Sequence, residues 1–217
     1  MKFPNAAKGI SKIFTSEILA LIAAIATGVA SILAAVMYAS AKTNSTAGAA
    51  ASGIGTLVLV LGASVLLVIA LILKIVGVVQ TSKDEDSFKM IIYLTIFTLI
   101  VAVIAAIFSR VTFLNNIANA VSAIGSFVTT LLIILGIGNL GVQVGNDEVI
   151  DKCSSQFKLI LGIGIVALLA RFFCIFLPTV PAQGIVIALA VVALVLNIIQ
   201  YILYLSLLSK AKKMLND

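Results

Sequence analysis

The chain contains no histidine and no tryptophan, and it has only two cysteines and three prolines among its 217 residues. Without histidine it has no Ser-His-Asp triad, and it lacks a principal zinc ligand. The cysteines, Cys153 and Cys174, are predicted to stand at different membrane depths, so they fit neither a zinc cluster nor a disulfide. No acidic residue lies deep in an apolar run. We therefore expect no metal, no cofactor and no enzymatic activity.

Charged residues are also scarce. They make up 10% of the chain, whereas 62% of its residues are hydrophobic. A soluble domain has about 25% charged and roughly 45–50% apolar residues. A water-soluble fold of this length cannot bury so much apolar surface. The composition excludes a soluble enzyme and a disordered linker, and it indicates an integral membrane protein whose surroundings are the lipid bilayer.

Apolar runs divide the chain into segments that reach the ~20 residues a helix needs to cross a bilayer. Transmembrane β-strands alternate polar and apolar residues, whereas these runs are apolar all round. The predicted fold is therefore all-α, with six transmembrane helices forming three consecutive helical hairpins. The fourth run is longer than a direct crossing needs, so residues 117–121 are expected to lie in the interface or to add tilt. The predicted spans are residues 18–39, 54–79, 90–108, 117–144, 159–177 and 184–208.

Lysines concentrate in the two termini and in alternate loops, which is the pattern of cytoplasmic segments. Both termini are therefore predicted to be cytoplasmic, in a multi-pass protein of the cell membrane. The net charge of +6 then reflects topology, and we expect no nucleic-acid partner. The basic residues on this side are Lys2, Lys8, Lys12, Lys83, Lys89, Lys152, Lys158, Lys210, Lys212 and Lys213.

Residues 1–16 form a separate element in this prediction, and residues 17–217 form a single six-helix transmembrane domain. Apolar residues recur at helical spacing in the first segment, which indicates an amphipathic helix on the inner leaflet; a disordered basic leader is the alternative. We expect the first apolar run to remain as a span, because a signal peptide has an apolar core of about 7–15 residues. Cleavage after Ala39-Ser40-Ala41 is the alternative, and it would leave five spans.

Polar residues near the ends of the runs predict where helices start. Asp84, Asp86 and Ser87 precede the third run, and Ser154 and Ser155 precede the fifth, at positions that suit helix N-caps. Glu17 is interpreted as a first-turn acid that interacts favourably with the dipole of the first span.

Two of the predicted cytoplasmic joins resemble each other. One ends in Ser87-Phe88-Lys89 and the other in Gln156-Phe157-Lys158, each after an acidic loop. A repeat of two spans would keep the same orientation in the membrane, so these joins are compatible with a parallel internal repeat. The alternative is that Phe and Lys simply anchor each helix at the interface.

The segment Gly136-Ile137-Gly138-Asn139-Leu140-Gly141 matches the dinucleotide-binding pattern G-x-G-x-x-G. That pattern binds a pyrophosphate only between a strand and the start of a helix. Here an apolar run continues directly into it. We interpret the match as accidental.

Polar side chains inside predicted spans are the remaining candidates for function. Lys74 and Arg171 are expected either to snorkel to the nearest surface or to form a substrate or ion site. Amide side chains lie in the inner parts of the fourth and sixth spans, where they would either line a polar vestibule with Lys74 or form interhelical hydrogen bonds. The predicted vestibule residues are Lys74, Asn139, Gln143, Asn197 and Gln200.

Small residues predict a helix-packing face on the first span. Ala20, Ala24 and Gly28 recur every four residues, and such stripes let membrane helices approach closely. The face is expected to pack within the bundle, or alternatively against a partner helix or a second copy of the chain.

Two functions remain open on these grounds. The first is an accessory or scaffold protein without catalytic apparatus, acting through helix contacts and cytoplasmic loops. The second is a small-solute transporter or channel with a polar vestibule near the cytoplasmic side. Convergence of the vestibule residues on one cavity would favour transport, whereas pairwise bonds across a dry interface would favour the scaffold.

Overall fold

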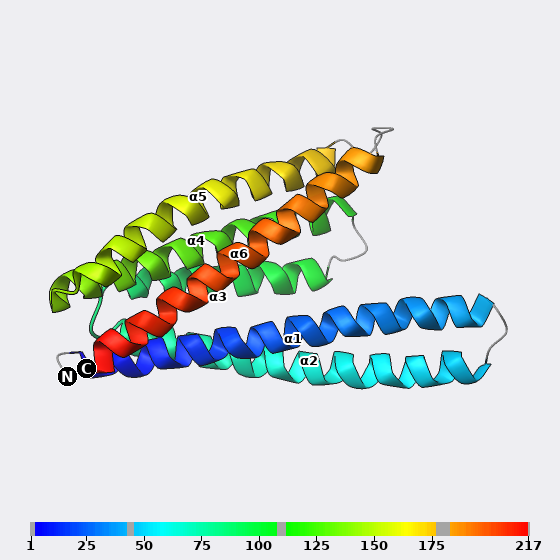
Figure 1. The fold of residues 1–217 in the computed structure, drawn as a ribbon, viewed down its shortest axis with the longest axis horizontal. Coiled ribbons are helices and arrows are strands. Elements are labelled where there is room, and N and C mark those ends of the chain that lie inside the picture. The colour runs from blue at the N-terminus through cyan, green and yellow to red at the C-terminus, as the bar shows by residue number, and fades with distance from the viewer. Residues whose placement is uncertain (1–2, 43–45, 108–111, 177–182, 217) are drawn as a thin grey trace. The chain divides into compact units, whose positions relative to one another are not determined.

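The computed structural model of the chain contains six helices and no strand among the residues it describes, which are 3–42, 46–107, 112–176 and 183–216. The prediction of an all-α fold is confirmed. The helices are α1 (Pro4–Lys42), α2 (Thr46–Thr81), α3 (Ser87–Ile107), α4 (Thr112–Val144), α5 (Asp147–Phe176) and α6 (Gln183–Asn216) (Figure 1). Within these helices, the side chains that lie outside the description are those of residues 39–42, 46–52, 105–106, 112–116, 119, 167–176, 183–194 and 197.

Four helices are long and apolar enough to cross a membrane: Pro4–Tyr38, Gly53–Thr81, Ser87–Ile104 and Ala120–Val144. In each of the first three, only 11% of the most apolar window is buried within the protein. Exposed apolar helices of this length are compatible with lipid and not with water, which supports a helical membrane protein. The side chains of residues 167–177 in the fifth predicted span and 184–194 in the sixth lie outside the description. The total of six spans therefore stays a prediction.

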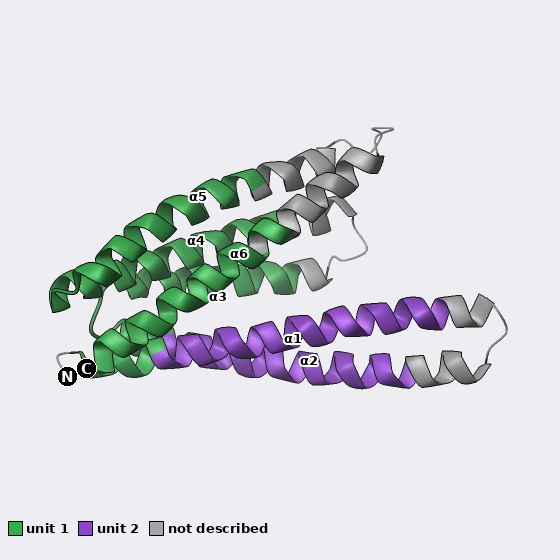
Figure 2. Ribbon diagram, viewed as in Figure 1, with its two compact units in different colours: residues 1–10, 78–217 green, residues 11–77 purple. Residues whose placement is uncertain are grey.

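The chain divides into two compact units (Figure 2). Unit 1 comprises residues 1–10 and 78–217, and unit 2 comprises residues 11–77. Helix α1 passes through residues 16 and 17 without a break, and the predicted domain boundary there stays a prediction. Because α1 begins at Pro4, Glu17 lies inside the helix, and its interpretation as a first-turn acid is wrong.

In unit 2, α1 and α2 form a helical hairpin that packs through small side chains. Ala23 and Ala30 of α1 are buried, as are Ala63 and Ala70 of α2. Each pair is seven residues apart, about two helical turns, so its members lie on one face. Larger apolar residues on the other faces are exposed; Ile25, for example, is 60% exposed. The hairpin therefore contacts itself along a narrow alanine seam and presents its large apolar side chains outward.

In unit 1, α3 packs against α4, α4 against α5, and α5 against α6. Among the described residues, many of its fully buried side chains lie near the start of α1 and α3, the end of α4 and the end of α6. Ile10, Phe88, Leu140 and Leu208 are all 0% exposed, as is Ile160 in the middle of α5. Figure 1 shows that these parts of the unit lie at the end that carries both termini. Most of the buried side chains that the structure describes in unit 1 therefore lie at that end.

Contacts at glycines establish how α3, α4 and α5 align. Phe88 lies beside Gly136, and Thr98 lies beside Gly125, so α3 and α4 are antiparallel. Helix α4 consequently continues beyond the start of α3 by the residues Ile137–Val144, about 12 Å of helix. The expectation that residues 117–121 lie in the interface or add tilt stays a prediction.

Helix α5 starts earlier than the apolar pattern predicted. It begins at Asp147, and the Asn146 side-chain oxygen accepts a hydrogen bond from the Val149 backbone N–H at 3.0 Å. Asn146 is therefore the N-cap, and the prediction that Ser154 and Ser155 occupy that position is wrong. Helix α3 begins at Ser87, so Ser87 is its first residue and not the N-cap that precedes it, and its hydroxyl donates a hydrogen bond to Glu85.

Candidate functional site

The loop between α2 and α3 carries three consecutive acidic residues, each with its own partner in unit 1. The carboxylate of Asp84 accepts hydrogen bonds from the Ala6 backbone N–H at 2.8 Å and from the Asn5 side-chain amide at 2.9 Å. A carboxylate at this position satisfies an unpaired N–H group of the first turn of α1 and interacts favourably with the helix dipole. Asp84 thus fixes the N-terminal segment from 78 residues away in the sequence.

Glu85 is the centre of the most connected polar cluster in the described part of unit 1. It is 8% exposed. One of its oxygens accepts hydrogen bonds from the Ser87 hydroxyl at 2.7 Å and from the Asn139 amide at 3.2 Å, and the other accepts one from the Gln143 amide at 2.7 Å. A hydrogen bond from a neutral donor to a carboxylate is roughly twice as strong as one between two neutral groups. The Glu85 cluster therefore joins the loop, the start of α3 and the end of α4.

Asn139 and Gln143 are identifiable from the sequence as polar residues within an apolar span, but their acceptor, Glu85, is not. The two amides are four residues apart, so they project from the same face of α4, and this spacing indicates that they share a partner. Which of the three neighbouring acids accepts from them depends on the loop conformation, and the sequence does not specify it.

We expect the Glu85→Gln variant to be less stable than the native protein by about 1–2 kcal/mol, because a neutral amide replaces the carboxylate and presents an NH₂ group to donors. Thermal unfolding in detergent measures the difference. Asp86→Asn is the control, since Asp86 pairs with Lys89 where both side chains are exposed, and such pairs contribute about 0–1 kcal/mol. Equal destabilisation by the two substitutions would contradict the structural role of Glu85.

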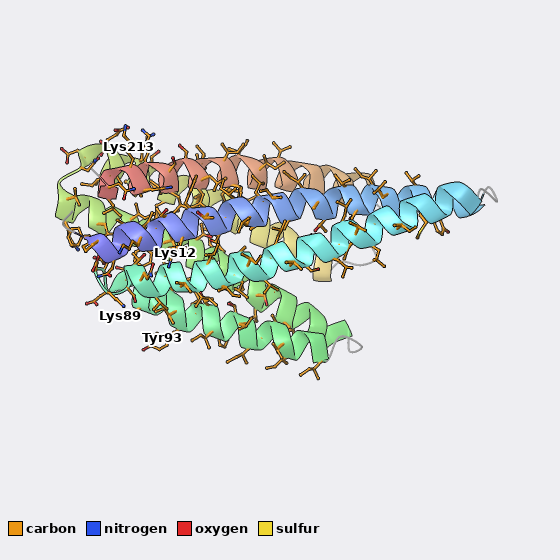
Figure 3. The ribbon with its side chains drawn as sticks, turned by 90° about the horizontal axis from the view of Figure 1, so that it is seen from below. Lys12, Lys89, Tyr93 and Lys213 are labelled. Atoms are coloured by element: carbon orange, nitrogen blue, oxygen red, sulfur yellow. The ribbon has the colours of Figure 1, made fainter. Side chains whose placement is uncertain are left out.

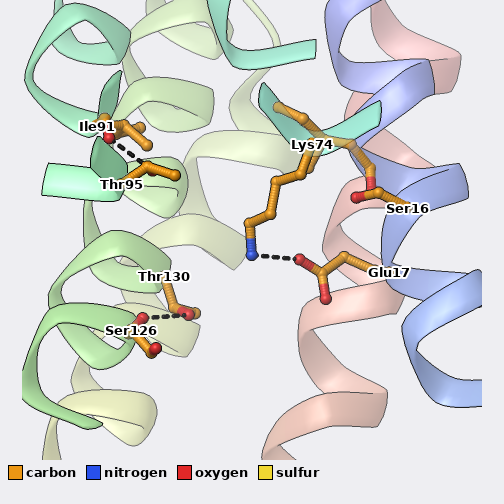
Figure 4. Close-up of polar contacts among 8 residues, drawn as sticks. Ser16, Glu17, Lys74, Ile91, Thr95, Ser126 and Thr130 are labelled. Atoms are coloured by element: carbon orange, nitrogen blue, oxygen red, sulfur yellow. Dashed lines mark hydrogen bonds and ion pairs between the residues drawn. The ribbon is translucent and has the colours of Figure 1, made fainter. Parts of the chain in front are cut away.

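In unit 2, Lys74 forms an ion pair with Glu17 across the α1–α2 hairpin (Figure 4). The Lys74 Nζ lies 2.8 Å from the Glu17 Oε1, and the two side chains are 29% and 9% exposed. This arrangement differs from both sequence-based interpretations of Lys74, snorkelling and a substrate site. A helix-borne acid is the partner that satisfies the lysine within an apolar hairpin.

The other residues predicted for the vestibule or the packing face have no described contact with Glu85 or with the Lys74–Glu17 ion pair. Gln200 lies half-buried on α6 in unit 1. The side chains of Asn197 and Arg171 lie outside the described residues. Ala24 and Gly28 are exposed on α1, and a Cβ atom added at Gly28 would meet nothing within 4 Å. The hairpin uses Ala23 and Ala30 instead, so the packing role of the face Ala20, Ala24 and Gly28 stays a prediction.

The three glycines of the G-x-G-x-x-G segment lie inside α4 and face neighbouring helices. Gly136 contacts Phe88 of α3, while Gly138 and Gly141 face Cys153 and Ile150 of α5. A glycine at these positions allows close approach between helices. The structure thus gives the segment a packing role, which supports the interpretation of the motif match as accidental.

Cys153 is 5% exposed at the contact between α4 and α5. Burial raises the pKa of its thiol to about 11, because an apolar environment disfavours the thiolate. The thiol is therefore expected to be a poor nucleophile at neutral pH.

We expect Cys153 to react with a maleimide at pH 8 at least about ten-fold more slowly than an ordinary exposed thiol. The measurement uses the folded protein with Cys174 replaced by serine. The matched control is Ser154→Cys in a chain that lacks both native cysteines, because Ser154 is the exposed neighbour on α5. Similar rates at the two positions would show that burial does not protect Cys153.

Where α5 begins and α6 ends, charged side chains surround a cavity of about 310 Å³ lined by residues that include Glu148 and Lys210. Glu148 forms an ion pair with Lys210. The hydrogen bond and positive charge of Lys210 lower the pKa of Glu148, while the neighbouring Lys210 lowers the pKa of Lys152. These exposed charges link α5 to α6 but contribute little stability.

Comparisons with known proteins add no relative. No protein-family model, curated protein or solved structure matches this chain.

Proposed function

We propose that the protein is a multi-pass membrane protein without catalytic apparatus that acts as an accessory or scaffold component. The observation that carries the proposal is the use of the polar side chains. Asn139 and Gln143 are donors to Glu85, and Lys74 pairs with Glu17. Polar groups that satisfy one another within helix contacts serve assembly, whereas a transport pathway needs polar groups that face a water-filled cavity. This use favours the scaffold over the transporter or channel.

The exposed surface of the α1–α2 hairpin also supports the proposal. Within its apolar windows, only 11% of the residues are buried. Large side chains such as Ile25 and Leu61 are each 60% exposed, and they are available to lipid or to helices of another membrane protein. We propose that partner helices, or a second copy of this chain, contact this surface.

Photocrosslinking in native membranes tests the proposal. A photoreactive amino acid at Ile25 or Leu61 should give discrete crosslinked bands with other membrane proteins or with a second copy. The control position is Ile91, which is 0% exposed in unit 1 and should give no intermolecular band. Recovery of the uncrosslinked monomer alone, with the probe at either exposed position, would contradict the scaffold role.

We also propose that both termini are cytoplasmic, because lysines concentrate in the termini and also occur at Lys83 and Lys89 beside the loop between α2 and α3. In a chain without native cysteines, a cysteine at Thr46 should react with an impermeant maleimide added to intact cells. A cysteine at Lys83 should react only after permeabilisation. The reverse labelling pattern would show that the orientation is inverted.

A further inference from the structure

A groove of about 270 Å³ lies between α4 and α5 in unit 1. Its walls are mainly apolar and include Leu135, Val142 and Phe157, while Asn139, Ser154 and Lys158 supply polar groups. The volume is many times the roughly 30 Å³ that one water occupies in the liquid. The groove therefore suits a ligand that has both an apolar and a polar part.

The alignment of the helices places this groove relative to the bilayer. The part of α3 that is apolar enough to cross a membrane begins at the first residue of the helix, Ser87. Its start therefore marks one edge of the hydrocarbon core. Phe88, the second residue of α3, lies beside Gly136 of α4, whose neighbours along the helix, Leu135 and Gly138, line the groove. The groove consequently lies at the level of the lipid headgroups.

Exposed residues on α3 agree with this level. Lys89 and Tyr93 project from the first turns of α3 (Figure 3), with Tyr93 74% exposed. Lysine and tyrosine are enriched at the boundary between hydrocarbon and water. On α5, the groove ends at Phe157 and Lys158, the pair that corresponds to Phe88 and Lys89 in the two similar joins.

The polar groups of the groove match a phosphate. Lys158 is exposed, and Ser154 precedes it by four residues, so the ammonium and the hydroxyl project from one face of α5. Both are donors, and lysine binds phosphate as a compact positive charge. On the α4 side of the groove, Asn139 contacts Glu85, whose oxygens also accept hydrogen bonds from Ser87 and Gln143.

We propose that the groove binds an anionic phospholipid, with its phosphate at Lys158 and Ser154 and its acyl chains along the outer surfaces of α4 and α5. Basic pockets between membrane helices bind anionic headgroups in this way. The inference goes beyond the scaffold function, because it requires only that these helices lie in a bilayer.

Native mass spectrometry of the purified full-length protein tests this proposal by titration with phosphatidylglycerol and phosphatidylcholine. We expect the native protein to retain phosphatidylglycerol about five-fold better, the preference that one well-placed lysine supplies. Lys158→Ala should reduce this ratio to about one. The matched control is Lys89→Ala, which removes a lysine near the same level of the bilayer whose side chain pairs with Asp86, and it should keep the native preference.

A second variant tests the apolar wall. Val142 is 63% exposed, so Val142→Asp should fold normally and repel the phosphate from the groove, again abolishing the preference. An unchanged preference in either groove variant, or equal losses in Lys158→Ala and Lys89→Ala, would overturn the proposal. So would displacement of the lipid by inorganic phosphate at equal concentration, since the site would then take free phosphate. Displacement by an amphipathic peptide alone would identify a protein-docking groove and would likewise overturn it.

Discussion

The Glu17→Leu variant is expected to lose about 3–5 kcal/mol of stability, because it leaves the Lys74 ammonium without its partner in an apolar hairpin. In the native protein the two charged groups are 2.8 Å apart, and the Glu17 side chain is only 9% exposed. Thermal unfolding in detergent, together with the yield of membrane-inserted protein, measures the loss. Ser64→Leu is the control, since Ser64 is exposed on α2 and bonds only within its own helix in the described contacts.

The double variant Glu17→Leu/Lys74→Leu separates the pair from the rest of the hairpin. Replacing both members of a buried ion pair with apolar residues is often neutral or stabilising. We therefore expect the double variant to recover most of the stability lost in Glu17→Leu. A double variant as unstable as Glu17→Leu would show that Glu17 acts through something other than Lys74.

The second large effect is expected at Gly136, where α4 contacts Phe88 of α3. A Cβ atom at this position would lie 2.3 Å from the Phe88 Cε2 atom, and the Phe88 side chain is 0% exposed, so it has no open space into which to move. Overpacking a filled core costs typically 1–3 kcal/mol. We expect Gly136→Ala to lower the free energy of unfolding by about 2–3 kcal/mol, as measured by thermal unfolding.

Two further variants establish the cause. Gly162→Ala is the matched control, because a Cβ atom there meets nothing within 4 Å; it should leave the stability unchanged or raise it slightly. Phe88→Leu should recover part of the loss when combined with Gly136→Ala, since the smaller side chain vacates space. Equal melting temperatures for Gly136→Ala and Gly162→Ala would show that the contact with Phe88 does not limit the approach of the helices.

The prediction of single residues succeeded where a local pattern was sufficient. The polar residues Asp84, Asp86 and Ser87 before the third apolar run indicated the region in which α3 begins. The start at Asp147 was missed because charged residues at the beginning of α5 interrupt the apolar run that was used to define the helix. These residues lie on an extension beyond the start of α3, where a helix need not be apolar.

Partners proved harder to predict than positions. Lys74 was identified as unusual, since a charge inside an apolar run is costly, but its pairing with Glu17 connects residues 57 positions apart. Asn139 and Gln143 were likewise identified without Glu85. The glycines of the G-x-G-x-x-G segment received no structural explanation until their neighbours on α3 and α5 were known.

The sequence by itself determined the class of this protein. A chain with no histidine, 10% charged residues and long apolar runs forms helices that belong in a bilayer, because backbone polar groups in lipid must be satisfied within each segment. The tertiary structure alone decided how the few polar groups are used and where the core lies. Spacing along a helix specifies a face, but only the alignment of antiparallel helices specifies what that face meets. That alignment joins Lys74 to Glu17 and surrounds Glu85 with donors.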